Sequence, residues 1–151
     1  MKTIFKSLTI LCIVMFLHTP SHAADPVYTG LFSKKAVGGY DTVTYFSGDA
    51  PVKGLEQFKT KWRGANWYFS TQENLDAFKA EPAKYAPQYG GYCAWAVAAK
   101  KDLVKGDPQV YSLHNNKLYL NYDPSIHKKW DAQKEQFILQ ADTTFPTLVT
   151  Q

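Results

Sequence analysis

The sequence predicts an α+β fold, a small single domain with two β-hairpins and about three helices. Segments rich in β-branched and aromatic residues occur in pairs around short turns, at 58–69 and at 110–121. Segments with helix-starting residues and helical spacing of apolar residues follow them. The length of 151 residues and the apolar fraction of 45% suit one core and exclude a multi-domain enzyme. No internal repeat, linker or low-complexity segment is evident.

Residues 1–23 predict a secretory signal peptide. Lys2 and Lys6 form a charged start, and the apolar stretch at 8–17 is too short to span a bilayer as a helix. Ser21-His22-Ala23 resembles a cleavage site, so we expect cleavage near Ala23 and a periplasmic or secreted protein without membrane insertion. An uncleaved N-terminal anchor is the alternative.

Processing at this site would change the charge and the cysteine count. The net charge of +4 falls to +2, and a single arginine with no basic stripe argues against a nucleic-acid partner. Cys12 leaves with the leader, so Cys93 becomes the only thiol and no internal disulfide can form. In an oxidising compartment, a lone thiol is either buried and inert or used.

The first half of the processed chain is predicted as an arm, a short strand and a hairpin. Residues 24–35 form an N-terminal arm with one apolar pair, Leu31-Phe32, and the domain proper covers 36–141. A short strand is predicted at 41–46 from its β-branched and aromatic residues. The hairpin pairs 58–62 with 67–69 across a turn at 63–66.

Helices and a second hairpin follow. Ser70 to Glu73 predict a capping box that opens a helix ending before Pro82, and 82–85 predict a second helical turn. The breaker cluster at 87–91 precedes an alanine-rich helix at 92–99, and the second hairpin pairs 110–113 with 118–121. Asp123 opens a C-terminal helix, and residues 142–151 are predicted as a C-terminal tail.

Cys93 is the first candidate for chemistry. Gly90 and Gly91 precede it, and the first turn of the predicted helix would favour a thiolate, which is both a nucleophile and a soft-metal ligand. The alternative is a small buried apolar residue, which is what most lone cysteines are.

Histidines and a carboxylate could assist Cys93. Thiolate and imidazole together suit copper or zinc, but His114 lies in a hairpin turn and His127 in a first helical turn, where histidines are commonly just solvated. Asp41 is either a turn residue that binds its own backbone or a carboxylate that faces the cysteine. Gly38-Gly39 lacks a lysine at phosphate-loop spacing, so no nucleotide cofactor is expected.

Aromatic residues surround the candidate cysteine. They belong to the core or line a pocket, and the candidates for pocket lining are Tyr40, Tyr89, Tyr92 and Trp95.

Several sequence blocks follow one another along the chain, and they include Lys61 to Ser70, Asn74 to Phe78, Glu81 to Tyr85 and Gly90-Gly91-Tyr92-Cys93. Together these blocks resemble the YHS domain, in particular exported YHS-domain-containing proteins of Gram-negative bacteria. The resemblance runs from about Ala36 to Trp130.

The resemblance implies a YHS-like fold and metal binding. In relatives, cysteines lie before the hairpin and just after its aromatic strand, whereas this sequence has Ser70 at the second position and no cysteine at the first. Cys93 and Asp41 match positions of the exported subgroup.

Three functions stay open. The leading hypothesis is binding or handling of a soft transition metal, copper first and zinc second, by Cys93 with His114 or Asp41 as helpers. The second is a thiol-dependent redox protein or enzyme with Cys93 as nucleophile. The third is a non-catalytic module that binds a protein partner, with Cys93 buried. No catalytic residue is assigned, non-enzymatic binding is favoured, and the oligomeric state is left open.

Overall fold

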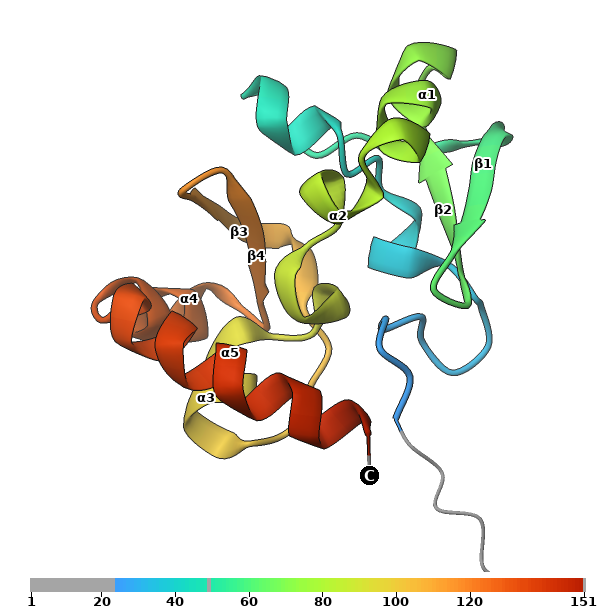
Figure 1. Cartoon of the computed structure of the whole chain (residues 1–151). Helices are drawn as coiled ribbons and strands as arrows, with labels where there is room; N and C mark the ends of the chain where they lie inside the picture. Colours follow the sequence, from blue (N-terminus) through green and yellow to red (C-terminus); the bar gives the residue numbers. More distant parts are fainter. Residues whose placement is uncertain (1–23, 49, 151) are drawn as a thin grey trace, which may run out of the picture.

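The computed structural model describes residues 24–48 and 50–150, and it has the predicted α+β class (Figure 1). The predicted signal peptide at 1–23 lies outside the described residues. Two antiparallel sheets of two strands each pack with α-helices and short 3-10 turns (η). The elements in chain order are η1 (Ala36–Gly39), η2 (Thr44–Ser47), β1 (Leu55–Trp62), β2 (Ala65–Phe69), α1 (Gln72–Ala80), α2 (Pro82–Tyr85), η3 (Gln88–Gly91), α3 (Ala94–Lys100), β3 (Asp107–His114), β4 (Lys117–Asn121), α4 (Pro124–Asp131) and α5 (Lys134–Val149).

Both predicted hairpins are present, and both turn on two residues with positive φ. Arg63 and Gly64 join β1 to β2 with φ of 47° and 77°, and Asn115 and Asn116 join β3 to β4 with φ of 49° and 57°. Two-residue loops of this conformation match the twist of the strands that they join. Each hairpin also contains a register shift near the start of its first strand.

Side-chain caps start the helices that follow the hairpins. The Thr71 hydroxyl accepts a hydrogen bond from the backbone N–H of Asn74 at 3.2 Å, so the N-cap of α1 is one residue later than the predicted Ser70. The Asp123 carboxylate caps α4 in the same way through Ile126 N at 2.8 Å. Such caps satisfy amides that have no partner inside the helix.

The C-terminal region differs from its prediction. The expected single helix is two helices, because the backbone of Gln133 (φ −144°, ψ 37°) leaves the helical region between α4 and α5. The predicted tail at 142–151 is helical as far as Val149. The described residues therefore contain five α-helices rather than about three.

The predicted strand at 41–46 is wrong, because this segment turns instead of extending. The Asp41 side chain accepts a hydrogen bond from Val43 N at 2.9 Å, and the Thr44 hydroxyl donates to the Asp41 carbonyl at 2.8 Å. Short polar side chains that bond to nearby backbone in this way compete with strand formation. The result is η2.

The fold is an internal duplication that the sequence analysis missed. We call residues 36–80 the first module and residues 88–132 the second module. β3 and β4 each begin and end 52 residues after β1 and β2, and α4 begins 52 residues after α1. The paired strand positions, including the register shift, repeat with the same offset. The antiparallel bridge between Tyr40 and Lys53 recurs between Tyr92 and Lys105.

Short sequence matches accompany the structural repeat. Gly38-Gly39-Tyr40 recurs as Gly90-Gly91-Tyr92, and Val52-Lys53-Gly54 recurs as Val104-Lys105-Gly106. An aromatic pair between the second strand and the following helix also recurs: Trp67 lies 4.9 Å from Phe78, and Tyr119 lies 5.3 Å from Trp130. The two modules thus share backbone and packing while most side chains differ.

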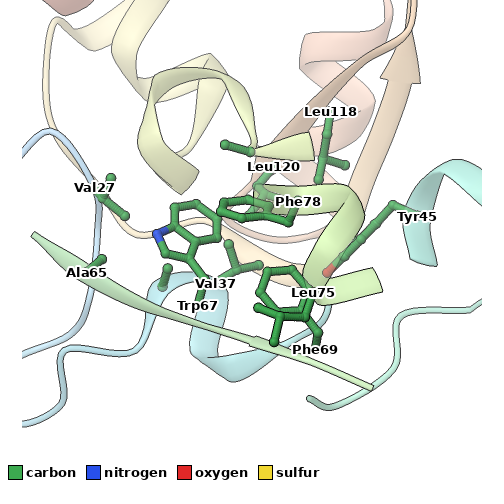
Figure 2. Close-up of a cluster of buried hydrophobic side chains, with 12 residues drawn as sticks. Val27, Val37, Tyr45, Ala65, Trp67, Phe69, Leu75, Phe78, Leu118 and Leu120 are labelled. Carbon is green, nitrogen blue, oxygen red and sulfur yellow. The ribbon is translucent and has the colours of Figure 1, made fainter. Parts of the chain in front are cut away.

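The core of the first module is completed by the second. Figure 2 shows Leu118 and Leu120 of β4 beside the aromatic side chains of β2 and α1. The Tyr45 hydroxyl donates to the Pro108 carbonyl at 2.9 Å and so links the modules further. A second apolar cluster joins α3 to α4 and α5 around Val97, Tyr119 and Trp130.

Among residues 24–48 and 50–150, no helix is both long enough and apolar enough to cross a bilayer.

Candidate functional site

Cys93 is held at the junction between η3 and α3. Its amide donates to the Val104 carbonyl at 2.8 Å, and its backbone bridges in parallel to Leu120 of β4. Gly90 and Gly91 before it have φ of 64° and 87°, which glycine adopts without strain. Cys93 occupies the N-cap position of α3 instead of lying inside its first turn, and its side chain is fully buried.

The sulfur of Cys93 lies among backbone amides and one buried amide side chain. Burial raises the pKa of the Cys93 thiol, while hydrogen bonds from the backbone N–H groups of Ala96, Tyr122 and Trp95 lower it, and the raising effect is the larger. The sulfur is 3.8 Å from Asn121 Oδ1, which also accepts a hydrogen bond from Trp95 N at 3.3 Å. The thiol is therefore protonated at neutral pH, in a cradle that would stabilise the sulfur once its proton left.

A line of polar groups continues from Cys93 through Asn121. The Asn121 side chain is fully buried and its Nδ2 lies 3.5 Å from His127 Nδ1. His127 Nε2 lies 3.3 Å from the Ser112 hydroxyl. Asn121 therefore connects the thiol to a partly buried imidazole, although no direct contact joins Cys93 and His127.

An apolar cavity of about 170 Å³ opens beside Cys93. Cys93 is the most deeply buried of its lining residues, which are Cys93, Trp95, Ala96, Lys100, Val104, Tyr122 and Ile126. Lysines surround the two aromatic walls: Lys100 and Lys129 lie 5.5 and 5.6 Å from the Trp95 ring centroid, and Lys105 lies 5.9 Å from that of Tyr122. The surroundings of the cavity are cationic while its interior is apolar.

Asp41 occupies in the first module the position that Cys93 occupies in the second. It is fully buried, and its side-chain oxygens accept four hydrogen bonds, from Val43 N (2.9 Å), Ser70 N (2.7 Å), Ser70 Oγ (2.6 Å) and Asn74 Nδ2 (2.7 Å). The counterparts of the Val43 and Ser70 amides are those of Trp95 and Tyr122, which face the Cys93 sulfur. The same backbone cradle therefore holds a carboxyl group in one module and a thiol in the other.

The predicted metal ligands are not brought together. All four hydrogen bonds to the Asp41 side chain come from the first module, and His114 Nε2 lies 3.6 Å from Glu135 Oε1 and 3.2 Å from Asn115 Nδ2, in a different cavity. Within the described ranges, no group of three or more His, Cys, Asp or Glu side chains could hold a metal ion.

Of the four aromatic residues expected to line a pocket, only Trp95 lines the Cys93 cavity. The Tyr89 hydroxyl donates to Asp142 Oδ1 at 2.8 Å, and burial raises its pKa. The Tyr92 hydroxyl donates to the Asp25 carbonyl at 3.0 Å, and the Tyr40 ring lies 3.8 Å from Lys53 Nζ. Tyr89 and Tyr92 each line another cavity, and all three tyrosines contact the arm, α5 or the first module.

Sequence reasoning missed Asn121 and Tyr122 as neighbours of Cys93. The repeat was the available signal, because a 52-residue offset aligns Cys93 with Asp41 and Tyr122 with Ser70.

Comparison with known families finds a match for one half of this duplicated α+β fold. The model of the YHS domain matches residues 43–89, so this segment is similar to the YHS domain, in agreement with the predicted resemblance. That family is linked to metal binding. No curated protein and no solved structure matches the chain. The matched segment covers most of the first module and ends before Cys93, which belongs to the repeated unit.

Proposed function

We propose that this protein is exported and handles a soft transition metal ion in transit, copper(I) first and zinc second, with Cys93 as its protein ligand. The supporting observation is the position of the Cys93 sulfur, which faces three backbone amides at the edge of a cavity. The link between the YHS family and metal binding favours the same class of function. The predicted leader at 1–23 is the reason to propose export.

The donor set does not fit a resident, fully coordinated metal ion. Cys93 is the single soft ligand at the cavity, and Asn121 Oδ1 beside it is a neutral oxygen. Copper(I) can be bound by only two ligands. Cys93 would supply one of them, and the molecule that delivers or receives the ion would supply the other. A site with one protein ligand suits passage of the ion rather than storage.

Proton release accompanies binding in this proposal. The thiol is protonated at neutral pH because burial raises its pKa. The ion would replace that proton, which passes to solvent, and the sulfur–metal bond would leave little net charge in the apolar cavity. The three amides then stabilise the sulfur's remaining negative charge. Affinity is therefore expected to increase with pH, up to the pKa of the Cys93 thiol.

The test is a copper(I) titration against a competing chelator, without oxygen and with a small thiol as the second ligand. Wild type is expected to bind one ion, and Cys93→Ser to bind at least about a hundredfold more weakly, since a hydroxyl is a poor ligand for copper(I). His114→Ala is the matched control and is expected to bind like wild type. Equal binding by Cys93→Ser and wild type would remove Cys93 from the site.

The burial of Cys93 also favours a second candidate, a non-catalytic module that binds a protein partner. Alkylation of Cys93 separates the candidates. For metal handling, we expect slow but measurable alkylation of native protein, accelerating as pH rises beyond the unperturbed thiol value of about 8.5. Alkylation that proceeds only after unfolding in urea would support the second candidate. Rapid alkylation at pH 7 would instead support a nucleophilic thiol, as in a redox protein or enzyme.

A further inference from the structure

One short loop in the N-terminal arm displays the two most exposed large apolar side chains of the described residues. Leu31 is 94% exposed and Phe32 is 101% exposed, while the next most exposed, Leu139, reaches 71%. Single exposed apolar residues are ordinary on protein surfaces, but two adjacent large ones at full exposure leave apolar area in water without any packing gain. This display is therefore a candidate contact surface.

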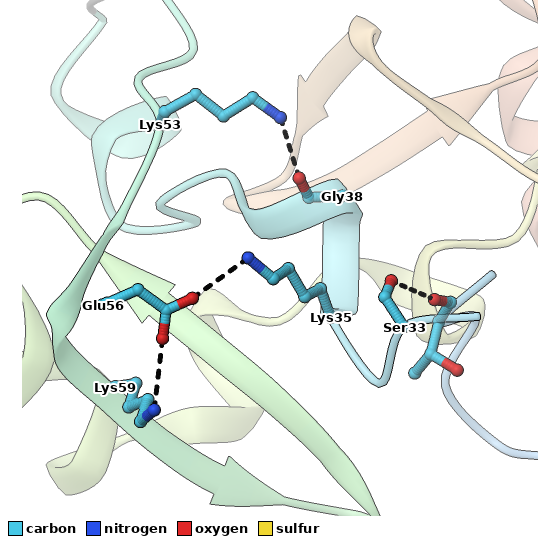
Figure 3. Close-up of polar contacts among 7 residues, drawn as sticks. Ser33, Lys35, Gly38, Lys53, Glu56 and Lys59 are labelled. Atoms are coloured by element: carbon cyan, nitrogen blue, oxygen red, sulfur yellow. Dashed lines mark hydrogen bonds and ion pairs between the residues drawn. The ribbon is translucent and has the colours of Figure 1, made fainter.

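The loop is fixed at both ends, so the exposure belongs to an ordered conformation. The Ser33 hydroxyl donates to the Thr29 carbonyl at 3.1 Å across the loop, as Figure 3 shows. Before the loop, Tyr28 N donates to the Gly90 carbonyl at 3.0 Å, and after it Asn66 N donates to the Lys34 carbonyl at 2.6 Å. The loop thus presents Leu31 and Phe32 outward with little conformational freedom left to lose on binding.

Cations gather beside this loop. Lys35 bridges in parallel to Asn66, and Asn66 pairs in register with Lys61 of β1, so the arm, β2 and β1 lie side by side. Residues 30–35 and 55–69 carry five cations, which are Lys34, Lys35, Lys59, Lys61 and Arg63, and one acid, Glu56. Glu56 lies 3.1 Å from both Lys35 and Lys59, and Figure 3 shows the three side chains together. Five cations and one acid give these segments a net charge of +4, equal to the net charge of the whole chain.

We propose that this surface, the arm face formed by residues 30–35 with Lys59, Lys61 and Arg63, binds an anionic phospholipid membrane. Two apolar side chains can enter the boundary between headgroups and acyl chains while the lysines and the arginine contact lipid phosphates. A protein partner fits less well, because a stable protein interface needs far more buried area than a two-residue apolar tip supplies. The proposal is independent of the metal-handling function.

The experiment is sedimentation of the purified protein with vesicles of phosphatidylcholine alone or with about 30% phosphatidylglycerol. Wild type is expected to bind the anionic vesicles and to bind less at high salt, because salt screens exposed charges. The double substitution Leu31→Ser with Phe32→Ser is expected to weaken partitioning at least about tenfold. Lys34→Glu is expected to weaken it several-fold, while the control Leu139→Ser leaves it unchanged.

Three results would overturn the proposal. They are the absence of wild-type binding to anionic vesicles, equal binding to both vesicle types, and unchanged binding by the double serine variant. Analytical ultracentrifugation of the same variants tests whether a second copy of the chain binds this surface instead. A wild-type dimer that the double serine substitution dissociates, in protein that does not bind vesicles, would assign the arm face to a second copy of the chain. Circular dichroism verifies that each variant is folded.

Discussion

The two modules show how much chemistry can change within one backbone. At the position after the Gly-Gly-Tyr sequence, the first module buries Asp41 and the second buries Cys93, and both residues are fully shielded from solvent. Asp41 has four donors, because Ser70 adds its hydroxyl and Asn74 its amide to the two backbone N–H groups. Cys93 has backbone amides and Asn121, because Tyr122 and Ile126 replace Ser70 and Asn74. The Asp41 side chain is fully hydrogen-bonded, while the Cys93 side chain borders a cavity.

Alanine substitution of Asp41 and of Cys93 should give the largest difference in stability between the two modules. Asp41→Ala leaves four donors without their acceptor and is expected to lower the free energy of unfolding by about 4 kcal/mol. Cys93→Ala removes one small buried side chain and is expected to cost about 1 kcal/mol. Urea unfolding of both variants measures the difference. Equal losses would mean that the polar network of Asp41 adds no stability.

The second largest difference is expected for alanine substitution of the equivalent glycines of η1 and η3. Gly38 and Gly90 both have positive φ, so alanine strains either one by about 1 kcal/mol. A side chain at position 90 would also collide with the backbone of Pro26 in the arm, whereas at position 38 it would make ordinary contacts with the Pro108 ring at 3.6 Å and the Tyr40 ring at 4.0 Å. Gly90→Ala is therefore expected to cost about 3 kcal/mol and Gly38→Ala about 1 kcal/mol. Similar costs in thermal unfolding would argue against tight seating of the arm.

Transfer of the first module's residue into the second sharpens the comparison further. Cys93→Asp places a carboxyl group where two of the four donors are missing and Asn121 Oδ1 lies nearby. We expect burial to raise the pKa of the introduced carboxyl and to cost about 2 kcal/mol at pH 7. Because the folded pKa would exceed the unfolded value of about 3.9, stability relative to wild type falls as pH rises from 4 to 7. A loss independent of pH would contradict this cause.

The smallest effect concerns His114, which stands where Trp62 stands in the first module. Trp62 packs against Trp67 and Phe78, whereas His114 pairs with the exposed Glu135. Glu135→Gln is expected to change the free energy of unfolding by less than about 1 kcal/mol, because Glu135 is exposed and exposed ion pairs contribute little. Thermal unfolding of the variant and wild type measures the effect. Loss of more than 2 kcal/mol would mark this pair as a structural element.

The sequence was most informative where local chemistry decides the structure. Both hairpins follow from β-branched and aromatic strands around turns that tolerate positive φ, and Pro82 separates α1 from α2. The segment at 41–46 has the composition of a strand, but the Asp41 side chain binds the backbone two residues later and turns it. The break between α4 and α5 has no proline or glycine to mark it.

The surroundings of Cys93 were harder to predict, because they depend on contacts between distant segments. Asn121 reaches the sulfur from the end of β4, 28 residues along the chain. The sequence suggests Asp41 as a helper ligand to Cys93, but the two residues occupy equivalent positions in different modules. Identity between the modules is limited to short blocks, so the offset is hard to recognise until the strands are superposed.

The leucines of β4 that complete the first module's core have a thermodynamic consequence. Leu118 and Leu120 are almost fully buried against side chains from η1, β2 and α1. If the second module unfolded alone, it would expose the apolar face of the first to water. Despite their matching backbones, the two modules should therefore melt together in a single transition, with equal calorimetric and van't Hoff enthalpies. The duplication has produced one cooperative folding unit rather than two independent domains.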